Sequence, residues 1–236
     1  MKTHFVHAKI TADCTLPKDL LKLLVDKPVG LVSNIQHLHM LKQVKEQLPK
    51  SLIAGQVLGC RADTAARIKD KVDCFLYVGT GRFHPIKVGI ETGKKVYCFD
   101  PCANGWFLLE QKTIDDHHNR RMGALNNFYH AERVGILVTT KVGQNDNKIN
   151  RYSVNNKMKA AQAFMARNDG KKYYVFAFDT LRMNDLEDFP FIQVWINTAC
   201  SRIADEKINM VNSDEIFAHE AMANEKKDTS LQIKRK

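Results

Sequence analysis

The sequence predicts an α/β protein of two related domains, each with a parallel sheet covered by helices. Two observations lead to this prediction. Short apolar runs that end on turn residues alternate with segments of helical spacing almost throughout the chain. In addition, the apolar run that begins at Val29 resembles the run that begins at Val134, which suggests a duplicated unit.

The first half of the chain alternates strands with a helix. Pro28 to Asn34 is an apolar run closed by turn residues, and His37 to Leu48 carries apolar residues at helical spacing. Cys74 to Gly81 and Lys95 to Pro101 predict two further strands, each stopped by glycine or by Asp-Pro. Continuous apolar strands of this kind are typical of parallel sheets, whose two faces are both covered.

The second half repeats this alternation after a connecting helix predicted at Thr113 to His130. Three strands are predicted at Arg133 to Thr140, Lys172 to Thr180 and Ile192 to Thr198, and helical spacing runs from Val154 to Asn168. We therefore expect one domain over residues 1–110 and a second over residues 111–223. A solvated basic tail is expected over residues 224–236.

The 236-residue chain is basic, with 36 Lys and Arg against 26 Asp and Glu and a formal net charge of +10. Part of this excess lies in the tail, so the charge is weak support for an anionic partner, and we expect no direct nucleic-acid binding. No apolar run reaches the roughly 18 residues that a membrane helix needs, and the N-terminus alternates like a strand. These features predict a cytoplasmic protein without membrane association, whose six cysteines are reduced.

The loop GTGRFHP combines glycines with a cation and an imidazole. Gly79 and Gly81 suggest a phosphate-binding loop, but His84 replaces the third glycine of the dinucleotide motif, and Pro85 stands where a helix would start. A tight turn explains the glycines equally well. Arg82 and His84 nevertheless lie at the carboxyl end of a predicted strand, where α/β proteins bind ligands. A ligand site and a simple turn therefore remain equal alternatives.

Four of the six cysteines have simple structural interpretations. Cys98 and Cys102 have C-x-x-x-C spacing but lack the second pair of ligands that a zinc site needs. The individual thiols are expected in buried strands or in a surface turn. These residues are Cys74 and Cys98 in strands, Cys102 at the end of the spacing, and Cys14 in the turn.

Cys60 and Cys200 stand apart from the other cysteines. Cys60 follows Gly59 and precedes an expected helix start, and Cys200 ends an apolar run two residues before Arg202. Backbone N–H groups and the positive end of a helix dipole favour the thiolate that binds metal at such places. Spacing alone does not distinguish two isolated cysteines from structural ones.

Five motifs in one order connect these features: GQVLGC, DCFLYVGTGRFHP, YCFDP, GILVTTKVGQ and VWINTACSRIAD. They resemble the signatures of the diphthamide synthase family, the 2-(3-amino-3-carboxypropyl)histidine synthases, from about residue 28 to about residue 217. The resemblance implies three related α/β domains that each give one cysteine to a shared 4Fe-4S cluster. It also implies that the reduced cluster cleaves S-adenosylmethionine. The resulting 3-amino-3-carboxypropyl radical then adds to a histidine of translation elongation factor 2, the first step of diphthamide biosynthesis.

The resemblance assigns roles to individual residues. Cys60 and Cys200 match two cluster cysteines, the second in a motif where Ser201 replaces the usual proline. Gln144 and Arg202 match positions near the S-adenosylmethionine pocket. There an Arg guanidinium can bind the methionyl carboxylate, and a Gln amide can bind its amino or carboxyl group. The other matching residues face the same centre, although stabilising polar contacts are an equally good interpretation for them. They are Gln36, His37, Thr80, Gly81, Arg82 and His84.

The chain departs from the family pattern because it begins where the family's second domain begins. A 4Fe-4S cluster that binds S-adenosylmethionine uses three thiolates, and two matching cysteines are present here. We expect a partner polypeptide to supply the first domain and the third cysteine, so that the chain is an enzyme component. Alternatives are a homodimer around shared clusters, a recruited cysteine, a two-domain nucleotide-binding protein without iron, and a non-catalytic paralogue that binds a synthase subunit or elongation factor 2.

Overall fold

The computed structural model describes residues 6–140, 161–166, 170–205 and 208–220. The chain forms two compact units, Met1–His117 and His118–Lys236. The boundary falls inside α5 (Gln111–His130), the long helix that the sequence predicts as a connection. Each unit has its own sheet and its own core, and each is described by itself below.

The first unit contains a five-stranded sheet with the order β2-β1-β3-β4-β5. The first four strands are parallel, and β5 pairs with β4 in the antiparallel direction. In chain order the strands are β1 (Val29–Ser33), β2 (Leu52–Gln56), β3 (Cys74–Val78), β4 (Lys95–Asp100) and β5 (Gly105–Leu108). The central strands β1 and β3 are buried along their whole length.

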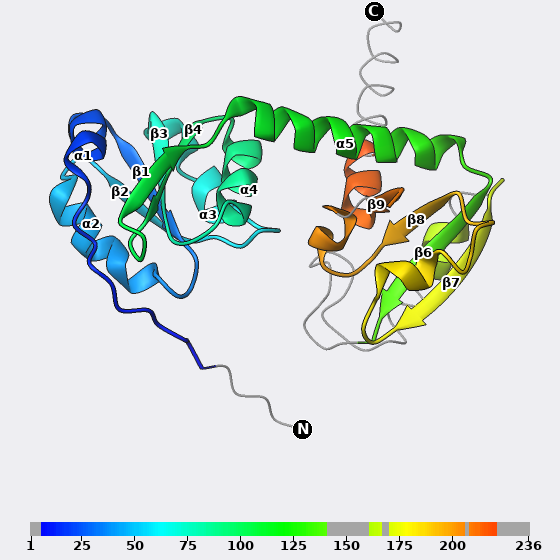
Figure 1. Ribbon diagram of the computed structural model, residues 1–236. Helices are drawn as coiled ribbons and strands as arrows, with labels where there is room; N and C mark the ends of the chain where they lie inside the picture. The colour runs from blue at the N-terminus through cyan, green and yellow to red at the C-terminus, as the bar shows by residue number, and fades with distance from the viewer. Residues whose placement is uncertain (1–5, 141–160, 167–169, 206–207, 221–236) are drawn as a thin grey trace, which may run out of the picture. The chain divides into compact units, whose positions relative to one another are not determined.

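Helices cover both faces of this sheet (Figure 1). One face packs against α1 (Lys18–Leu24), η1 (Leu38–Met40) and α2 (Leu41–Gln47). The opposite face packs against α3 (Asp63–Ala66) and α4 (Phe83–Thr92), with Ile114 of α5 added at its margin. A short 3-10 turn, η2 (Lys69–Lys71), leads into β3. The unit is therefore a three-layer sandwich in which the carboxyl ends of four parallel strands share one edge.

The second unit contains a four-stranded parallel sheet with the order β7-β6-β8-β9. Its strands are β6 (Arg133–Thr139), β7 (Lys172–Phe178), β8 (Val194–Asn197) and β9 (Met210–Asn212). The second half of α5 and the helical residues 161–166 and 213–220 cover one face. The other face packs against η3 (Met183–Leu186) and η4 (Ser201–Asp205), and it includes Phe176 of β7 and Trp195 of β8, whose rings are in contact.

Both units place their parallel strands in the same spatial order. The first strand of each unit lies between the second and the third, and the fourth follows the third. The register agrees in detail, because Gly30 pairs with Phe75 and Gly135 pairs with Trp195. In each pair a β-carbon on the glycine would lie 2.4 Å from the aromatic ring. The Val-Gly echo in the sequence thus corresponds to a repeated packing feature.

The predicted fold class is confirmed, with two local corrections and three further strands, β2, β5 and β9, that the sequence does not predict. A helix does begin at Phe83, because proline at the third position, Pro85, is tolerated where no intrahelical donor is required. Cys14 is fully buried in the first core rather than in a surface turn. The antiparallel strand β5 follows a turn in which Asn104 has a φ of 48°. Within the described residues no helix is long and apolar enough to cross a membrane.

Candidate functional site

The candidate residues of the first unit lie in loops at the carboxyl ends of its parallel strands. The loop after β1 carries Gln36 and His37, the loop after β2 carries Cys60, and the loop after β3 carries Thr80 to His84. The strand order changes direction between β1 and β3, and crevices at such switch points are where open α/β sheets bind ligands. The topology therefore places these loops at one edge of the sheet.

Cys60 lies exposed at the tip of a tight turn. Leu58 and Arg61 close this turn through two backbone hydrogen bonds of 2.8 and 3.2 Å, which leaves Gly59 and Cys60 between them. A β-carbon on Gly59 would lie 1.6 Å from the ring of Phe83, so glycine allows the turn to lie against the start of α4. The turn is thus held to the rest of the unit, and Cys60 at its tip is exposed.

The expected helix-dipole contact at Cys60 is corrected by this geometry. The helix that follows, α3, has only four residues and begins at Asp63, three positions after the cysteine. A helix this short has a small dipole, and the N-cap position belongs to Ala62. Exposure at a turn, rather than a helix terminus, is what makes the Cys60 thiol available.

Gln36 and His37 contribute differently to the loop after β1. The carbonyl of Gln36 accepts a hydrogen bond from the backbone of Ile10 (3.1 Å), and its side chain is half-buried. His37 is completely buried, its Nδ1 lies 2.8 Å from Oδ1 of Asn34, and burial lowers its pKa. Its Nε2 has no hydrogen-bond partner among the described residues. His37 is therefore a neutral imidazole that donates from Nδ1 and stabilises the loop.

The loop after β3 is organised around the buried side chain of Tyr77. The phenolic oxygen lies 3.4 Å from the carbonyl of Thr80 and 3.3 Å from Nδ1 of His84, whose ring stacks on the tyrosine. Burial raises the pKa of Tyr77, so the hydroxyl keeps its proton. Gly81 adopts a φ of 77°, which only glycine takes readily, and nothing fills the space beside it. The guanidinium of Arg82 is exposed over the ring of Phe107 at 4.7 Å.

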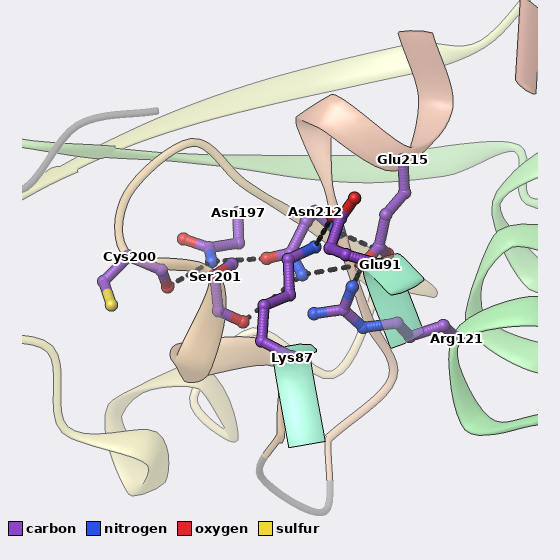
Figure 2. A network of polar contacts seen from close by, with 8 residues as sticks. All are labelled: Lys87, Glu91, Arg121, Asn197, Cys200, Ser201, Asn212 and Glu215. Carbon is purple, nitrogen blue, oxygen red and sulfur yellow. Dashed lines mark hydrogen bonds and ion pairs between the residues drawn. The ribbon is translucent and has the colours of Figure 1, made fainter. Parts of the chain in front are cut away.

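In the second unit, Cys200 lies in the loop between β8 and η4 and is half-buried. Its carbonyl accepts hydrogen bonds from the backbone of Ile203 (3.0 Å) and from the side-chain amide of Asn197 (2.8 Å). Figure 2 shows the thiol directed away from these contacts. Cys200 immediately precedes the 3-10 helix η4.

A chain of buried polar side chains continues from Asn197. Its amide also donates to Oδ1 of Asn212 (2.7 Å), and the Asn212 amide donates to Glu215 (3.0 Å) and to the carbonyl of Ser201 (3.3 Å) (Figure 2). Glu215 forms an ion pair of 2.8 Å with Arg121 of α5. Burial raises the pKa of Glu215, while Arg121 and Asn212 oppose this shift.

Sequence reasoning did not identify Asn197, Asn212 or Glu215 as part of the site. The available signal was the polar Asn197 at the end of an otherwise apolar strand, directly before the TACSR motif. Gln144 lies outside the described residues. Arg202 belongs to η4, but its side chain is likewise outside what the structure describes.

The remaining cysteines differ in their access to solvent. Burial raises the pKa of Cys74 to about 11 and that of Cys98 to about 12, and it also raises the pKa of Cys14. Cys102 is exposed. Within the described part of the chain, no three His, Cys, Asp or Glu side chains gather as a metal site would require.

Comparison with known proteins connects both units to one family. The family model described as "Putative diphthamide synthesis protein" matches residues 1–208. The 2-(3-amino-3-carboxypropyl)histidine synthase of Pyrococcus horikoshii is 25% identical over 194 residues, covering 75% of this chain and 51% of the relative. Subunit 1 of the synthase from Gallus gallus is 25% identical over 211 residues, covering 85% of this chain and 48% of the relative. The chain thus spans about half the length of the curated relatives that it matches.

A solved structure supports the same fold. The crystal structure of Dph2 from Pyrococcus horikoshii with a 4Fe-4S cluster matches with a TM-score of 0.66 and 23% identity, covering 84% of this chain and 58% of that one. The family match extends over most of the sequence and includes the loops of both Cys60 and Cys200. The protein therefore belongs to the diphthamide synthesis family.

Proposed function

We propose that the chain is a component of a diphthamide synthase. It acts on a histidine of translation elongation factor 2 in the cytoplasm and uses S-adenosylmethionine to transfer a 3-amino-3-carboxypropyl group, the first step of diphthamide biosynthesis. Its part in the enzyme is to provide two cysteine ligands for a 4Fe-4S cluster and surfaces for the nucleoside substrate.

One structural observation carries this proposal. Each unit presents a cysteine from a loop at the carboxyl ends of its parallel strands, Cys60 in the first unit and Cys200 in the second, and hydrogen bonds hold each loop in place. The first unit also exposes Cys102 in the turn after β4. The three thiols in the cores are poor ligands because burial keeps them protonated. Among the cysteines outside the cores, Cys60 and Cys200 match the family's cluster cysteines, whereas Cys102 lies at no matching position.

The donor set fits part of such a cluster. Cys60 is exposed and Cys200 is half-buried, and neither thiol is needed to fill a core. Iron in 4Fe-4S clusters is held by thiolates, so both residues have the required chemistry. Two thiolates are one fewer than a cluster with one open iron requires. We therefore place the third cysteine on a partner polypeptide that carries the first domain.

The residues around the presented thiols have separable tasks. A reduced cluster would supply the electron for cleavage of S-adenosylmethionine. By the family resemblance, Arg202 would bind the methionyl carboxylate and Gln144 its amino or carboxyl group. The glycine-rich turn at Thr80 and Gly81 leaves room for a ligand, and Arg82 adds an exposed positive charge beside it. The neutral His37 and the protonated Tyr77 keep the two central loops in shape.

Anaerobic reconstitution tests the proposal directly. The full chain is incubated with iron and sulfide, alone and together with a polypeptide that carries only the family's first domain from the same genome. We expect a cluster, measured by iron and sulfide counts and by the spectrum of the reduced state, when the two polypeptides are combined. Cys60→Ala and Cys200→Ala are expected to abolish it, whereas Cys102→Ala, which removes another exposed thiol, retains it.

Other outcomes select among the alternatives. A stable cluster in the chain alone indicates a homodimer or a recruited cysteine. A measurement of molecular size detects the homodimer, and alanine variants of the other cysteines identify a recruited ligand. Absence of iron in every preparation overturns the proposal. Binding of the chain to a complete synthase subunit or to elongation factor 2 in that case favours a non-catalytic binding module.

A further inference from the structure

We propose that Asn197 and Asn212 are positioning residues that fix the backbone around Cys200, so that its thiol is presented in one orientation. The inference rests on the proposed function, in which Cys200 is a cluster ligand and needs a fixed orientation. The positioning itself is a property of the second unit without any metal, and it can be tested separately.

The orientation of the Asn197 amide is determined by the backbone. Its Oδ1 accepts a hydrogen bond from the N–H of Ala199 (2.9 Å), and a backbone N–H can only donate. The Nδ2 group must therefore face the carbonyl of Cys200 at 2.8 Å and Oδ1 of Asn212 at 2.7 Å. Both amide protons are used, and the side chain is 1% exposed, so no other arrangement satisfies it.

Asn212 holds the next peptide group. Its Nδ2 donates to the carbonyl of Ser201 at 3.3 Å and to Oε1 of Glu215 at 3.0 Å. The backbone N–H of Asn212 donates to the second carboxylate oxygen of Glu215 at 3.3 Å. Arg121 binds the same carboxylate, so the amide pair is anchored through Glu215 to α5. Asn212 is 2% exposed, so its amide has little contact with bulk solvent.

Together the two amides bind backbone groups on both sides of the cysteine. Ala199 is held through its N–H, and Cys200 and Ser201 are held through their carbonyls. The thiol takes no part in these bonds, and Figure 2 shows it pointing away from both amides. A network that restrains the backbone and leaves the thiol free is what a metal ligand requires.

The first unit offers an internal comparison. The register that pairs Gly30 with Phe75 and Gly135 with Trp195 makes Tyr77 equivalent to Asn197, two residues further along each strand. Tyr77 also bonds the carbonyl three residues on, that of Thr80, but the contact is longer at 3.4 Å. The pair of amides, Asn197 and Asn212, thus occurs in the second unit, which has Cys200 where the first unit has Thr80.

The first test measures the alkylation rate of Cys200 in the reduced, metal-free full chain with iodoacetamide, mapped by mass spectrometry. Asn197→Leu keeps the size of the side chain and removes its hydrogen bonds. The variant loses three hydrogen bonds, one of them to the Cys200 carbonyl. We expect the Cys200 rate to rise at least about fivefold, which corresponds to the loss of that one bond at about 1 kcal/mol. The rate at Cys102 in the first unit serves as the internal reference.

Thr198→Val is the matched control. This neighbour donates a hydrogen bond of 2.7 Å from its hydroxyl to the carbonyl of Leu137, away from the Cys200 loop. The variant loses one hydrogen bond of similar quality, yet we expect the Cys200 rate to stay near that of the wild type. Equal rates in Thr198→Val and Asn197→Leu overturn the proposal. If Asn197→Leu does not fold, Asn212→Ser, which removes the bond to Ser201, answers the same question.

The second test uses the reconstituted assembly and distinguishes the two proposals. Asn197→Leu is expected to bind iron but to give a broadened or shifted electron paramagnetic resonance spectrum of the reduced cluster, whereas Thr198→Val gives the wild-type spectrum. A wild-type spectrum from Asn197→Leu overturns the positioning role. If no preparation binds iron, the proposed function fails, and the alkylation rates still decide whether the amide pair positions Cys200.

Discussion

Gly135 and Trp195 face each other on neighbouring strands, and the indole ring occupies the space that a β-carbon on residue 135 would need, at 2.4 Å. Gly135→Ala is therefore expected to destabilise the chain by about 1 to 3 kcal/mol, because the indole must move within a packed core. Urea unfolding followed by tryptophan fluorescence measures the change. Gly30→Ala, opposite Phe75, should have a similar effect in the first unit.

Gly123→Ala is the control for that prediction. Gly123 lies in the exposed middle of α5, and nothing approaches its added β-carbon within 4 Å. Alanine in a helix should raise the free energy of unfolding by about 0.5 to 1 kcal/mol. Destabilisation of Gly123→Ala comparable to that of Gly135→Ala would show that backbone effects, rather than the indole contact, dominate.

The reactivity of the cysteines should divide by burial. Cys74 and Cys98 have pKa values of about 11 and about 12, so at pH 8 they remain protonated as well as covered. Native-state labelling with iodoacetamide at pH 8 should therefore modify Cys60 and Cys102, which are exposed, long before these two. Early modification of Cys98 in the folded chain would contradict its place in the core.

The ion pair of Arg121 with Glu215 should contribute to stability, since the carboxylate is largely buried. Arg121→Met leaves that charge without its cation and is expected to destabilise the chain by about 2 to 3 kcal/mol at pH 8. The loss should shrink at pH 5, because burial already raises the Glu215 pKa and protonation removes the unpaired charge.

An exposed ion pair provides the comparison. Lys50 and Asp26 are 3.2 Å apart, and their side chains are 58% and 88% exposed. Lys50→Met is expected to change the free energy of unfolding by less than about 1 kcal/mol. Equal changes in the free energy of unfolding for Lys50→Met and Arg121→Met would show that burial does not strengthen the ion pair of Arg121 with Glu215.

His37 should make the first unit sensitive to acid. Its pKa is lowered in the folded state by burial, so its contribution to stability is present above the ordinary value near 6.5 and is lost as the pH falls through the folded value. We expect wild-type protein to lose more unfolding free energy between pH 7.5 and 5.5 than His37→Asn, by at most about 1.4 kcal/mol per pH unit. Identical pH dependence of the two proteins would exclude this linkage.

The fold class follows from the sequence because buried parallel strands leave continuous apolar runs, as in β1, β3, β6 and β8. The edge strand β2 lacks that signal, since its residues are exposed or half-buried. The three-residue β9 is too short to show a pattern. Helix α4 was missed because Pro85 was taken to exclude a helix start, whereas the first turn accepts proline.

Cys60 was set apart by Gly59 and an expected helix start and Cys200 by the apolar run before it, but their role as a pair came from the family resemblance. The contacts around Cys200 depend on distant residues. Asn212 and Glu215 lie 12 and 15 positions after Cys200, and Arg121 comes from a helix that precedes the whole second sheet. Short-range spacing cannot reveal such contacts. For the same reason the sequence predicts Cys14 in a surface turn, whereas strands and helices that follow it in the chain bury it.

The shared strand order of the two units also allows the positions of Cys60 and Cys200 to be compared. Cys200 follows the third strand of its unit, where the first unit has Thr80 at the equivalent place. Cys60 instead follows the second strand of its unit, and the corresponding loop after β7, residues 179–182, contains no cysteine. The two units therefore share a strand order but carry these two cysteines after different strands. A superposition of one sheet on the other would not bring the two cysteines to the same place.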